Sequence, residues 1–340
     1  MNIIKWFIIA SIIISNQIIA DESFNKFNSK YDLLNFFELQ QNRIFWKLNS
    51  YQSQDFHSND YFLVNQSSNK SKVDSTRIKW EYLGPFIGAV VITNFSLYYI
   101  FKGAYWNEQK TKFHTFNDWN NADMNIDKLG HFYAGMLLSN ASYKILKATN
   151  VPENYSVISS ILSSIFFQTQ VEIHDAYYKK WGWSWWDFSG NVLGAIYPHL
   201  QNHFKPLQSI NLKWSYHPSP AYKKGWYDYW IKDYEGFTYY LSFNMHSILP
   251  SPIDNYWPKW LNIAVAYGVE KVKLGKNIWN SSGKPLGDRE WYISIDYSLL
   301  KLFNPESKTL REILDLIDHF HFPAPAIRIF PSTIWYGIYF

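Results

Sequence analysis

The sequence predicts an α+β fold in which an α-helical bundle is followed by an antiparallel β region. Before Pro206 the apolar residues recur with the spacing of helices, and after it they alternate with polar residues, which is the period of half-buried strands. With 47% hydrophobic and 18% charged residues, the chain of 340 residues also has the composition of a folded protein.

Residues 1–20 predict a secretory signal peptide. Lys5 supplies the positive charge, residues 6–14 form a short apolar run, and Ala20 ends a suitable cleavage site. An uncleaved anchor is the alternative, but the apolar run is short for a bilayer span. We therefore expect cleavage after Ala20 and export.

Residues 21–76 are rich in Asn, Ser, Gln and Lys and are predicted to be partly disordered. A helical domain is predicted over residues 77–206, with helices at residues 83–101, 127–149, 157–177 and 187–204. The first of these contains 19 residues and no charge, so it could be either a transmembrane helix or a buried helix of the bundle.

Residues 207–340 predict an antiparallel β-rich domain. We expect six strands, at residues 210–216, 239–245, 263–269, 291–298, 326–330 and 334–340, and one helix at 304–320 that begins at Asn304-Pro305-Glu306. A terminal Phe340 on an alternating aromatic strand is typical of outer-membrane proteins. We nevertheless favour a soluble sheet packed on the helices, because six strands are too few to span a membrane alone.

The composition excludes several functional classes. Because the chain has 0 Cys, it cannot form disulfides, Cys-ligated metal centres, a Cys nucleophile or a lipid anchor on a mature N-terminal Cys. The net charge of +4 is too small and too dispersed to favour nucleic acid. The sequence also contains neither a glycine-rich phosphate loop nor a serine nucleophile elbow.

Three predicted helices each carry a polar pair in an apolar setting. The pairs are Asp127 and His131, Glu172 and Asp175, and Asp187 and Asn191. Spacings of i,i+3 and i,i+4 place both members of a pair on one helix face. If the three faces meet, these side chains must satisfy one another or bind a ligand, because burying them unpaired costs several kcal/mol each.

One interpretation of this constellation is a metal or acid–base site. His131, Glu172, Asp175 and Asp187 suit a divalent metal such as Zn, Mn or Mg, and Asp127 could act as a general base. This interpretation predicts a metal-dependent hydrolase acting on an envelope lipid or phosphate ester.

A structural network is the interpretation that we favour. Ser184 and Asp187 have the form of a helix capping box, and Lys128 could form a buried ion pair with Glu172. His131 would then be a core histidine hydrogen-bonded to a carboxylate. This interpretation predicts a non-catalytic protein with a structural or lipid-binding role, whose aromatic-rich surface, with 20% aromatic residues in the chain, contacts membrane lipid or envelope proteins.

The same residues resemble the YfiM-like family of predicted periplasmic lipoproteins, a family without an assigned function. The motifs that carry the resemblance are Asp127-Lys128-Leu129-Gly130-His131-Phe132, Glu172-x-x-Asp175, Trp181-Gly182-Trp183-Ser184-Trp185-Trp186-Asp187 and Asn191-x-x-Gly194. The flanking segments 106–118, 243–247, 259–264 and 322–325 are similar to those of longer Bacteroidetes-type members, so the resemblance covers roughly residues 80–340. The motif order is more faintly similar to VanZ-like membrane proteins. Both resemblances imply an envelope context, which for the exported chain means the periplasm or outer membrane of a Gram-negative bacterium, and they supply no reaction. A minor subunit of an outer-membrane assembly is a third possibility, suggested by Phe340.

Overall fold

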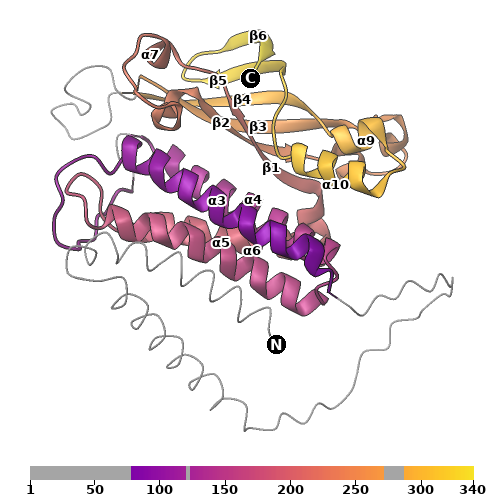
Figure 1. The fold of residues 1–340 in the computed structure, drawn as a ribbon. Helices are drawn as coiled ribbons and strands as arrows, with labels where there is room; N and C mark the ends of the chain where they lie inside the picture. Colours follow the sequence, from indigo (N-terminus) through magenta and orange to yellow (C-terminus); the bar gives the residue numbers. More distant parts are fainter. Residues whose placement is uncertain (1–77, 120–122, 272–286) are drawn as a thin grey trace. The chain divides into compact units, whose positions relative to one another are not determined.

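The computed structural model describes residues 78–119, 123–271 and 287–340 (Figure 1). The predicted signal peptide and the polar segment 21–76 lie outside these residues. Four long helices come first: α3 (Trp80–Ala104), α4 (Ile126–Ala148), α5 (Glu153–Asp175) and α6 (Trp185–His203). They agree with the four helices that the sequence predicts, and the predicted α+β fold is confirmed.

Helix α4 packs closely against α6 because glycine removes the side chain at the contact. A Cβ at Gly194 would overlap the backbone of Phe132 and lie 2.8 Å from its carbonyl carbon. Gly190 also faces α4, and a Cβ added to it would lie 3.2 Å from the Lys128 carbonyl oxygen. These two glycines therefore allow the backbones of α4 and α6 to approach each other closely.

Helix α3 contains residues 83–101, for which the sequence allowed two interpretations. Its Leu83 is fully buried against Leu146 of α4 and Val151. Within the described ranges, no helix combines the length and the apolarity that crossing a bilayer requires.

Six strands follow and form one antiparallel sheet in the order of the sequence. They are β1 (Ile210–Tyr216), β2 (Phe237–Phe243), β3 (Leu261–Glu270), β4 (Asp288–Tyr297), β5 (Ala324–Phe330) and β6 (Ile334–Tyr339). All six predicted strands are present, although β2 begins and ends two residues earlier than predicted. Met245, which the alternation placed at the end of that strand, instead begins the short helix α8 (Met245–Ile248).

The helices and the sheet share one hydrophobic core. Met124, Ile126 and Tyr133, from α4 and the residues before it, pack against Tyr239 of β2 and Tyr267 of β3. Tyr267 also donates a hydrogen bond to the Met124 carbonyl oxygen (2.5 Å). The polar positions on α4, α5 and α6 are therefore held beside one face of the sheet.

The segment predicted as one helix over residues 304–320 forms two shorter helices. Helix α9 (Leu299–Phe303) ends at Asn304, which adopts a left-handed conformation with φ 40°. Helix α10 (Lys308–Ile317) begins after Ser307, whose hydroxyl accepts a hydrogen bond from the Leu310 amide (3.4 Å). The predicted start at Asn304 is wrong because the serine, rather than the Asn-Pro-Glu motif, caps the helix. A further short α-helix of the described residues is α7 (Pro220–Lys223).

Replacing Gly194 with alanine should destabilise the fold. Because the added methyl group meets backbone atoms of Phe132, α4 and α6 would have to move apart, and we expect a loss of roughly 2–4 kcal/mol in unfolding free energy. Gly84→Ala on α3 is the matched control. Nothing lies within 4 Å of a Cβ at Gly84, and alanine favours the helix by about 1 kcal/mol. Urea unfolding would measure both, and equal stability of the two variants would contradict the packing argument.

Candidate functional site

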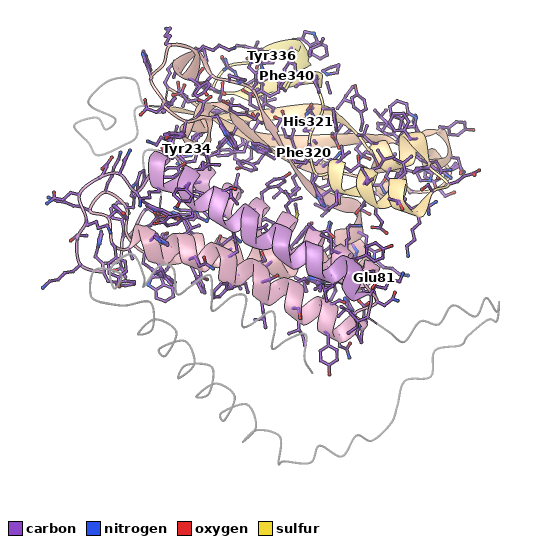
Figure 2. The ribbon with its side chains drawn as sticks, viewed as in Figure 1. Glu81, Tyr234, Phe320, His321, Tyr336 and Phe340 are labelled. Atoms are coloured by element: carbon purple, nitrogen blue, oxygen red, sulfur yellow. The ribbon has the colours of Figure 1, made fainter. Side chains whose placement is uncertain are left out.

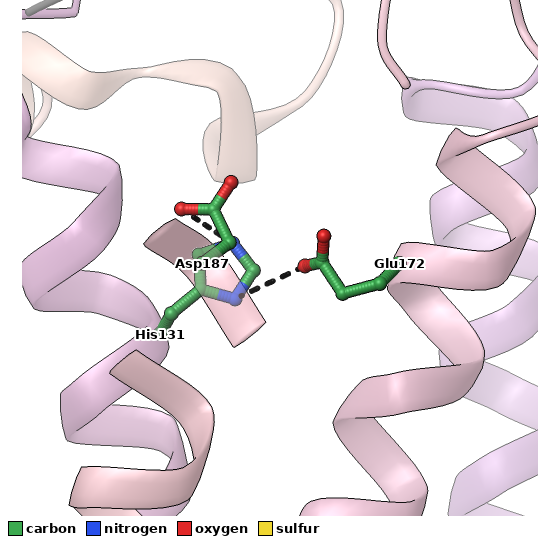
Figure 3. A group of neighbouring side chains, drawn as sticks. All are labelled: His131, Glu172 and Asp187. Carbon is green, nitrogen blue, oxygen red and sulfur yellow. Dashed lines mark ion pairs between the residues drawn. The ribbon is translucent and has the colours of Figure 1, made fainter. Parts of the chain in front are cut away.

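Helices α4, α5 and α6 bring the predicted polar pairs together around His131. Figure 3 shows the imidazole between two carboxylates, with Nδ1 3.6 Å from Glu172 Oε1 and Nε2 3.8 Å from Asp187 Oδ1. Nδ1 also donates a hydrogen bond to Asn191 Oδ1 (2.9 Å). One residue of α4 thus contacts both α5 and α6, as the helical spacings predicted.

Lys128 forms the second centre of the cluster. Its ammonium group contacts the carboxylates of Asp118, Asp127 (2.8 Å) and Asp187 (2.8 Å). The sequence allowed an ion pair between Lys128 and Glu172; the structure instead places Lys128 among the three aspartates, next to Asp127 on the first turn of α4. The charge of this buried lysine is therefore balanced locally.

Asp118 is the member of the cluster that the sequence interpretation missed. It lies in the segment between α3 and α4 and accepts a hydrogen bond from the Ser184 hydroxyl (2.6 Å). The Ser184 oxygen in turn accepts a hydrogen bond from the Asp187 amide (3.1 Å), so the predicted capping residue is confirmed. Asp118 belongs to no periodic element, and only its place in the flanking motif of the family resemblance pointed to it.

Asp175 lies at the end of α5 and has a different partner. Its Oδ1 accepts a hydrogen bond from the Trp106 indole (2.6 Å), and that indole stacks on His174 with 4.2 Å between ring centroids. Among the described residues, two groups of three could hold a metal ion: His131, Glu172 and Asp187, and Asp118, Asp127 and Asp187. Asp175 belongs to neither group.

The first group is the better candidate for a metal, because the Lys128 ammonium already occupies the second. Its ligand atoms lie within 4.8 Å of one another, whereas ligands around a tetrahedral zinc ion are about 3.4 Å apart. The two carboxylates also face opposite nitrogens of the imidazole. The carboxylates would have to move toward a single nitrogen before a metal could bind.

A buried atom of this group and one of its neighbour Asn191 make no hydrogen bond with the described residues. Glu172 is 1% exposed, and its Oε1 accepts no hydrogen bond from the described part of the chain. The Asn191 amide nitrogen likewise donates none there. Atoms of this kind either carry a protonation state that suits their surroundings or bind a ligand.

Burial and mutual charge shift the pKa values of the cluster. Burial raises the pKa of Glu172 to about 8, against the opposing charge of His131, and raises that of Asp175 to about 7, against the hydrogen bond from Trp106. Burial likewise raises the pKa of Asp187 to about 6, against the charge of His131. Burial would lower the pKa of His131, but the charges of Asp187 and Glu172 outweigh it and raise that pKa to about 9. The native cluster therefore retains protons at neutral pH that the unfolded chain would release.

A cavity of about 360 Å³ adjoins the cluster. Aromatic and aliphatic side chains from α3, α4, α5 and the sheet form much of its wall, including Phe101, Leu138, Phe167, Trp214 and Phe237. The carboxylates of Asp118, Asp127, Asp175 and Asp187 line it together with His131. The cavity thus combines an apolar wall with an acidic end, and its size suits a small ligand.

The part of the chain that contains this site matches a protein-family model. Residues 116–203 match the model described as predicted periplasmic lipoprotein (DUF2279). The match includes Asp118 and extends through α4, α5 and α6, so it contains every residue of the cluster. It agrees with the expected resemblance to predicted periplasmic lipoproteins over these residues. No curated protein and no solved structure gives a significant match to the chain.

Between about pH 6.5 and 9 the stability of the protein should fall as pH rises. Raised pKa values of His131, Glu172, Asp175 and Asp187 mean that the native state binds more protons than the unfolded state. His131 stabilises the native state fully below its unfolded pKa of 6.5, and this stabilisation is lost as the pH rises through its native pKa of about 9. The three carboxyl groups destabilise the native state increasingly as the pH rises from their unfolded pKa values toward their native values of about 6, 7 and 8. Each extra native proton contributes about 1.4 kcal/mol per pH unit.

Urea unfolding of Glu172→Gln across this pH range would test the assignment. Because glutamine cannot release a proton, we expect the unfolding free energy to change less steeply with pH than in the original chain. Glu108→Gln, at an exposed ion pair with Lys180, is the control and should keep the original slope. An unchanged slope in Glu172→Gln would show that Glu172 is not one of the groups that hold these protons.

Proposed function

We propose that the protein is an exported envelope protein that binds an amphipathic molecule in the cavity and does not act as a catalyst. The observation that carries this proposal is the cavity of about 360 Å³, in which an aromatic wall ends at a group of carboxylates. An apolar body of a ligand would bury against the aromatic wall, while a polar head would meet the acidic end. The match of residues 116–203 to a predicted periplasmic lipoprotein family supports an envelope location.

The charge around the cavity favours a ligand with a positively charged head. Five aspartates line the cavity, namely Asp118, Asp123, Asp127, Asp175 and Asp187, whereas its cationic lining consists of His131 and Lys180. Lys128 balances part of this excess from behind the wall. The charge of a ligand ammonium group would balance the carboxylates in place of the protons that these groups retain because of their raised pKa values. It would also avoid the cost of burying a negative head beside aspartates.

The surroundings of His131 argue for a structural role of this residue. Both ring nitrogens are engaged, Nδ1 with Asn191 and Glu172 and Nε2 with Asp187. A protonated imidazole held between two carboxylates cannot accept a further proton from a substrate. The cluster therefore fixes α4 against α5 and α6 and presents its remaining negative charge to the cavity.

Binding of dodecylamine would test this function. Isothermal titration calorimetry below the critical micelle concentration should show dodecylamine binding on the order of tenfold more tightly than dodecanoate, because the carboxylates attract one head and repel the other. Ala134→Phe should weaken dodecylamine binding by a similar factor, since Ala134 lines the cavity. Ala148→Phe, at the exposed end of the same helix, is the control.

A second variant separates the charge from the shape of the site. Asp175→Asn keeps an oxygen that can accept the Trp106 hydrogen bond but removes the negative charge. We expect it to reduce the preference for dodecylamine over dodecanol. Equal affinities for dodecylamine and dodecanoate in the original chain would contradict the proposal.

A metal-dependent hydrolase acting on an envelope lipid or phosphate ester is the alternative. It is supported by Glu172 Oε1, which is buried beside His131 without a hydrogen bond, and by the convergence of His131, Glu172 and Asp187 within 4.8 Å. These three side chains would hold the ion, and Asp127 could take a proton from a bound water. Asp175, also predicted as a ligand, would have to leave Trp106 to take part.

Elemental analysis of the purified protein distinguishes the two functions. The hydrolase requires close to one divalent ion per chain, which should be lost in both His131→Ala and Glu172→Gln. His203→Ala, exposed at the end of α6, is the control and should retain the ion. A metal-free original chain that still binds dodecylamine would exclude the hydrolase and leave the binding function in place.

A further inference from the structure

The sheet distributes its side chains in the reverse of the pattern expected in water. Along β4 the residues Glu290, Tyr292, Ser294 and Asp296 are buried, whereas the alternate residues, from Trp291 to Ile295, are exposed. An antiparallel sheet with one solvated face normally buries its apolar side chains and exposes its polar ones.

The exposed face is apolar in register across five strands. Residues that pair directly from β2 to β6 form one continuous row: Leu241, Val265, Ile293, Ile327 and Trp335. On one side of this row Phe243, Ile263 and Ile295 are paired, and on the other Trp291 pairs with Phe330. Ile293 at the centre is 46% exposed and Trp335 at the edge strand is 65% exposed.

The opposite face is polar and buried, and further hydrogen bonds complete its central ion pair. Lys213 and Asp296 form an ion pair there (2.9 Å), with both side chains 1% exposed. Asp296 accepts a hydrogen bond from Ser242 (2.6 Å), and Lys213 donates to the Tyr297 carbonyl oxygen (2.7 Å). His321, which precedes β5, stacks on Tyr240 with 3.7 Å between ring centroids. The charged groups are therefore built into the fold, and the apolar face is left to the surroundings.

Helix α4 covers only part of the apolar face. It packs against Tyr239 and Tyr267, which belong to the same face as Leu241 and Val265. The surface beyond these tyrosines continues toward β6 at the edge of the sheet; Figure 2 shows this strand, which carries Tyr336, away from the helices. The uncovered part thus has the same chemistry as the part that packs in the protein core.

The ends of the uncovered face carry the aromatic and charged residues. Trp291 and Arg289 lie at one end of β4, and Tyr297 lies at the other. The ring centroids of Tyr297 and Trp260 are 6.1 Å apart. The exposed Lys259 directly precedes Trp260. Trp291 and Tyr297 are about 20 Å apart along β4, and the side chains between them on this face, Ile293 and Ile295, are aliphatic. An uncharged aliphatic band bordered by aromatic rings and basic side chains is complementary to lipid chains bordered by phosphate groups.

We propose that the uncovered apolar face of β2–β6 lies against the hydrocarbon chains of a membrane, with its aromatic ends at the lipid headgroups. This surface is separate from the cavity, and it gives the protein a membrane contact that does not depend on a ligand. The partner is phospholipid, which contacts the uncharged side chains of this face and the basic residues at the ends of its strands.

Single-cysteine labelling tests this surface directly, because the chain contains 0 Cys. The full chain with Ile293→Cys would be labelled with an environment-sensitive dye and reconstituted with phosphatidylethanolamine–phosphatidylglycerol vesicles. Leu162→Cys on α5, where Leu162 is 54% exposed, is the matched control. The dye at 293 should shift to the blue and be quenched several-fold more by lipid labelled within the acyl chain than the dye at 162. The dye at Trp291→Cys, at one end of the aliphatic stretch of β4, should respond more to headgroup-labelled lipid than the dye at 293.

Charge substitution provides an independent measurement. Ile293→Arg should weaken vesicle binding on the order of tenfold or more, whereas Leu162→Arg should not, and near-ultraviolet circular dichroism would establish that both variants are folded. Equal responses at positions 293 and 162 would overturn the proposal. Shielding of the dye at position 293 in the absence of vesicles would also overturn the proposal. If the protein were then a dimer, the partner of this face would be a second copy of the chain; if it were a monomer, the partner would be a segment of the same chain.

Discussion

The buried cluster of carboxylates around Lys128 and His131 determines how the helices meet. Each cation extends from α4 and is held by groups on other segments: Lys128 by Asp118 and Asp187, and His131 by Asp187 and Glu172. These contacts require α4 and α6 to lie close together, which the absence of a side chain at Gly194 permits. Because an unpaired charge in such a place costs several kcal/mol, the helix positions and the charges depend on each other.

The cluster is not neutral, and this links its structure to its proposed role. Five carboxylates, those of Asp118, Asp127, Glu172, Asp175 and Asp187, surround two cationic side chains. The raised pKa values of Glu172 and Asp175 show that retained protons compensate part of the excess. A cationic ligand or a metal ion would compensate the same charge, so both proposed functions use one electrostatic property. They differ in geometry: the cavity is already formed, whereas the ligand atoms of the metal group would have to converge.

The helical part of this arrangement could be predicted from the sequence because helical spacing relates position along the chain to direction in space. The pairs Asp127 and His131, and Asp187 and Asn191, face one another as predicted. Asp118 and Trp106 could not be derived from periodicity, since they lie outside the regular elements. The carboxylates that pair with Lys128 could not be predicted from the sequence either, because three helices and a loop place several carboxylates at similar distances from it.

The sheet shows a different limit of sequence reasoning. Alternation along residues 210–216 correctly predicts a strand, but it does not reveal which face is buried. The usual assumption places Trp214 inside and Lys213 outside, whereas Lys213 is 1% exposed and paired with an equally buried Asp296. Only the pairing of strands shows that the polar residues collect on one side.

This reversed polarity follows from the way the charged groups are satisfied. A buried ion pair stabilises a protein only when further hydrogen bonds complete its coordination, and Ser242 and the Tyr297 carbonyl oxygen complete that of Asp296 and Lys213. If the sheet were turned to place Leu241, Val265 and Ile293 inside, these partners would be lost. The polar side therefore has to be the interior, and the apolar side has to meet a second apolar phase. Helix α4 supplies that phase over Tyr239 and Tyr267, and a lipid surface would supply it over the remaining strands.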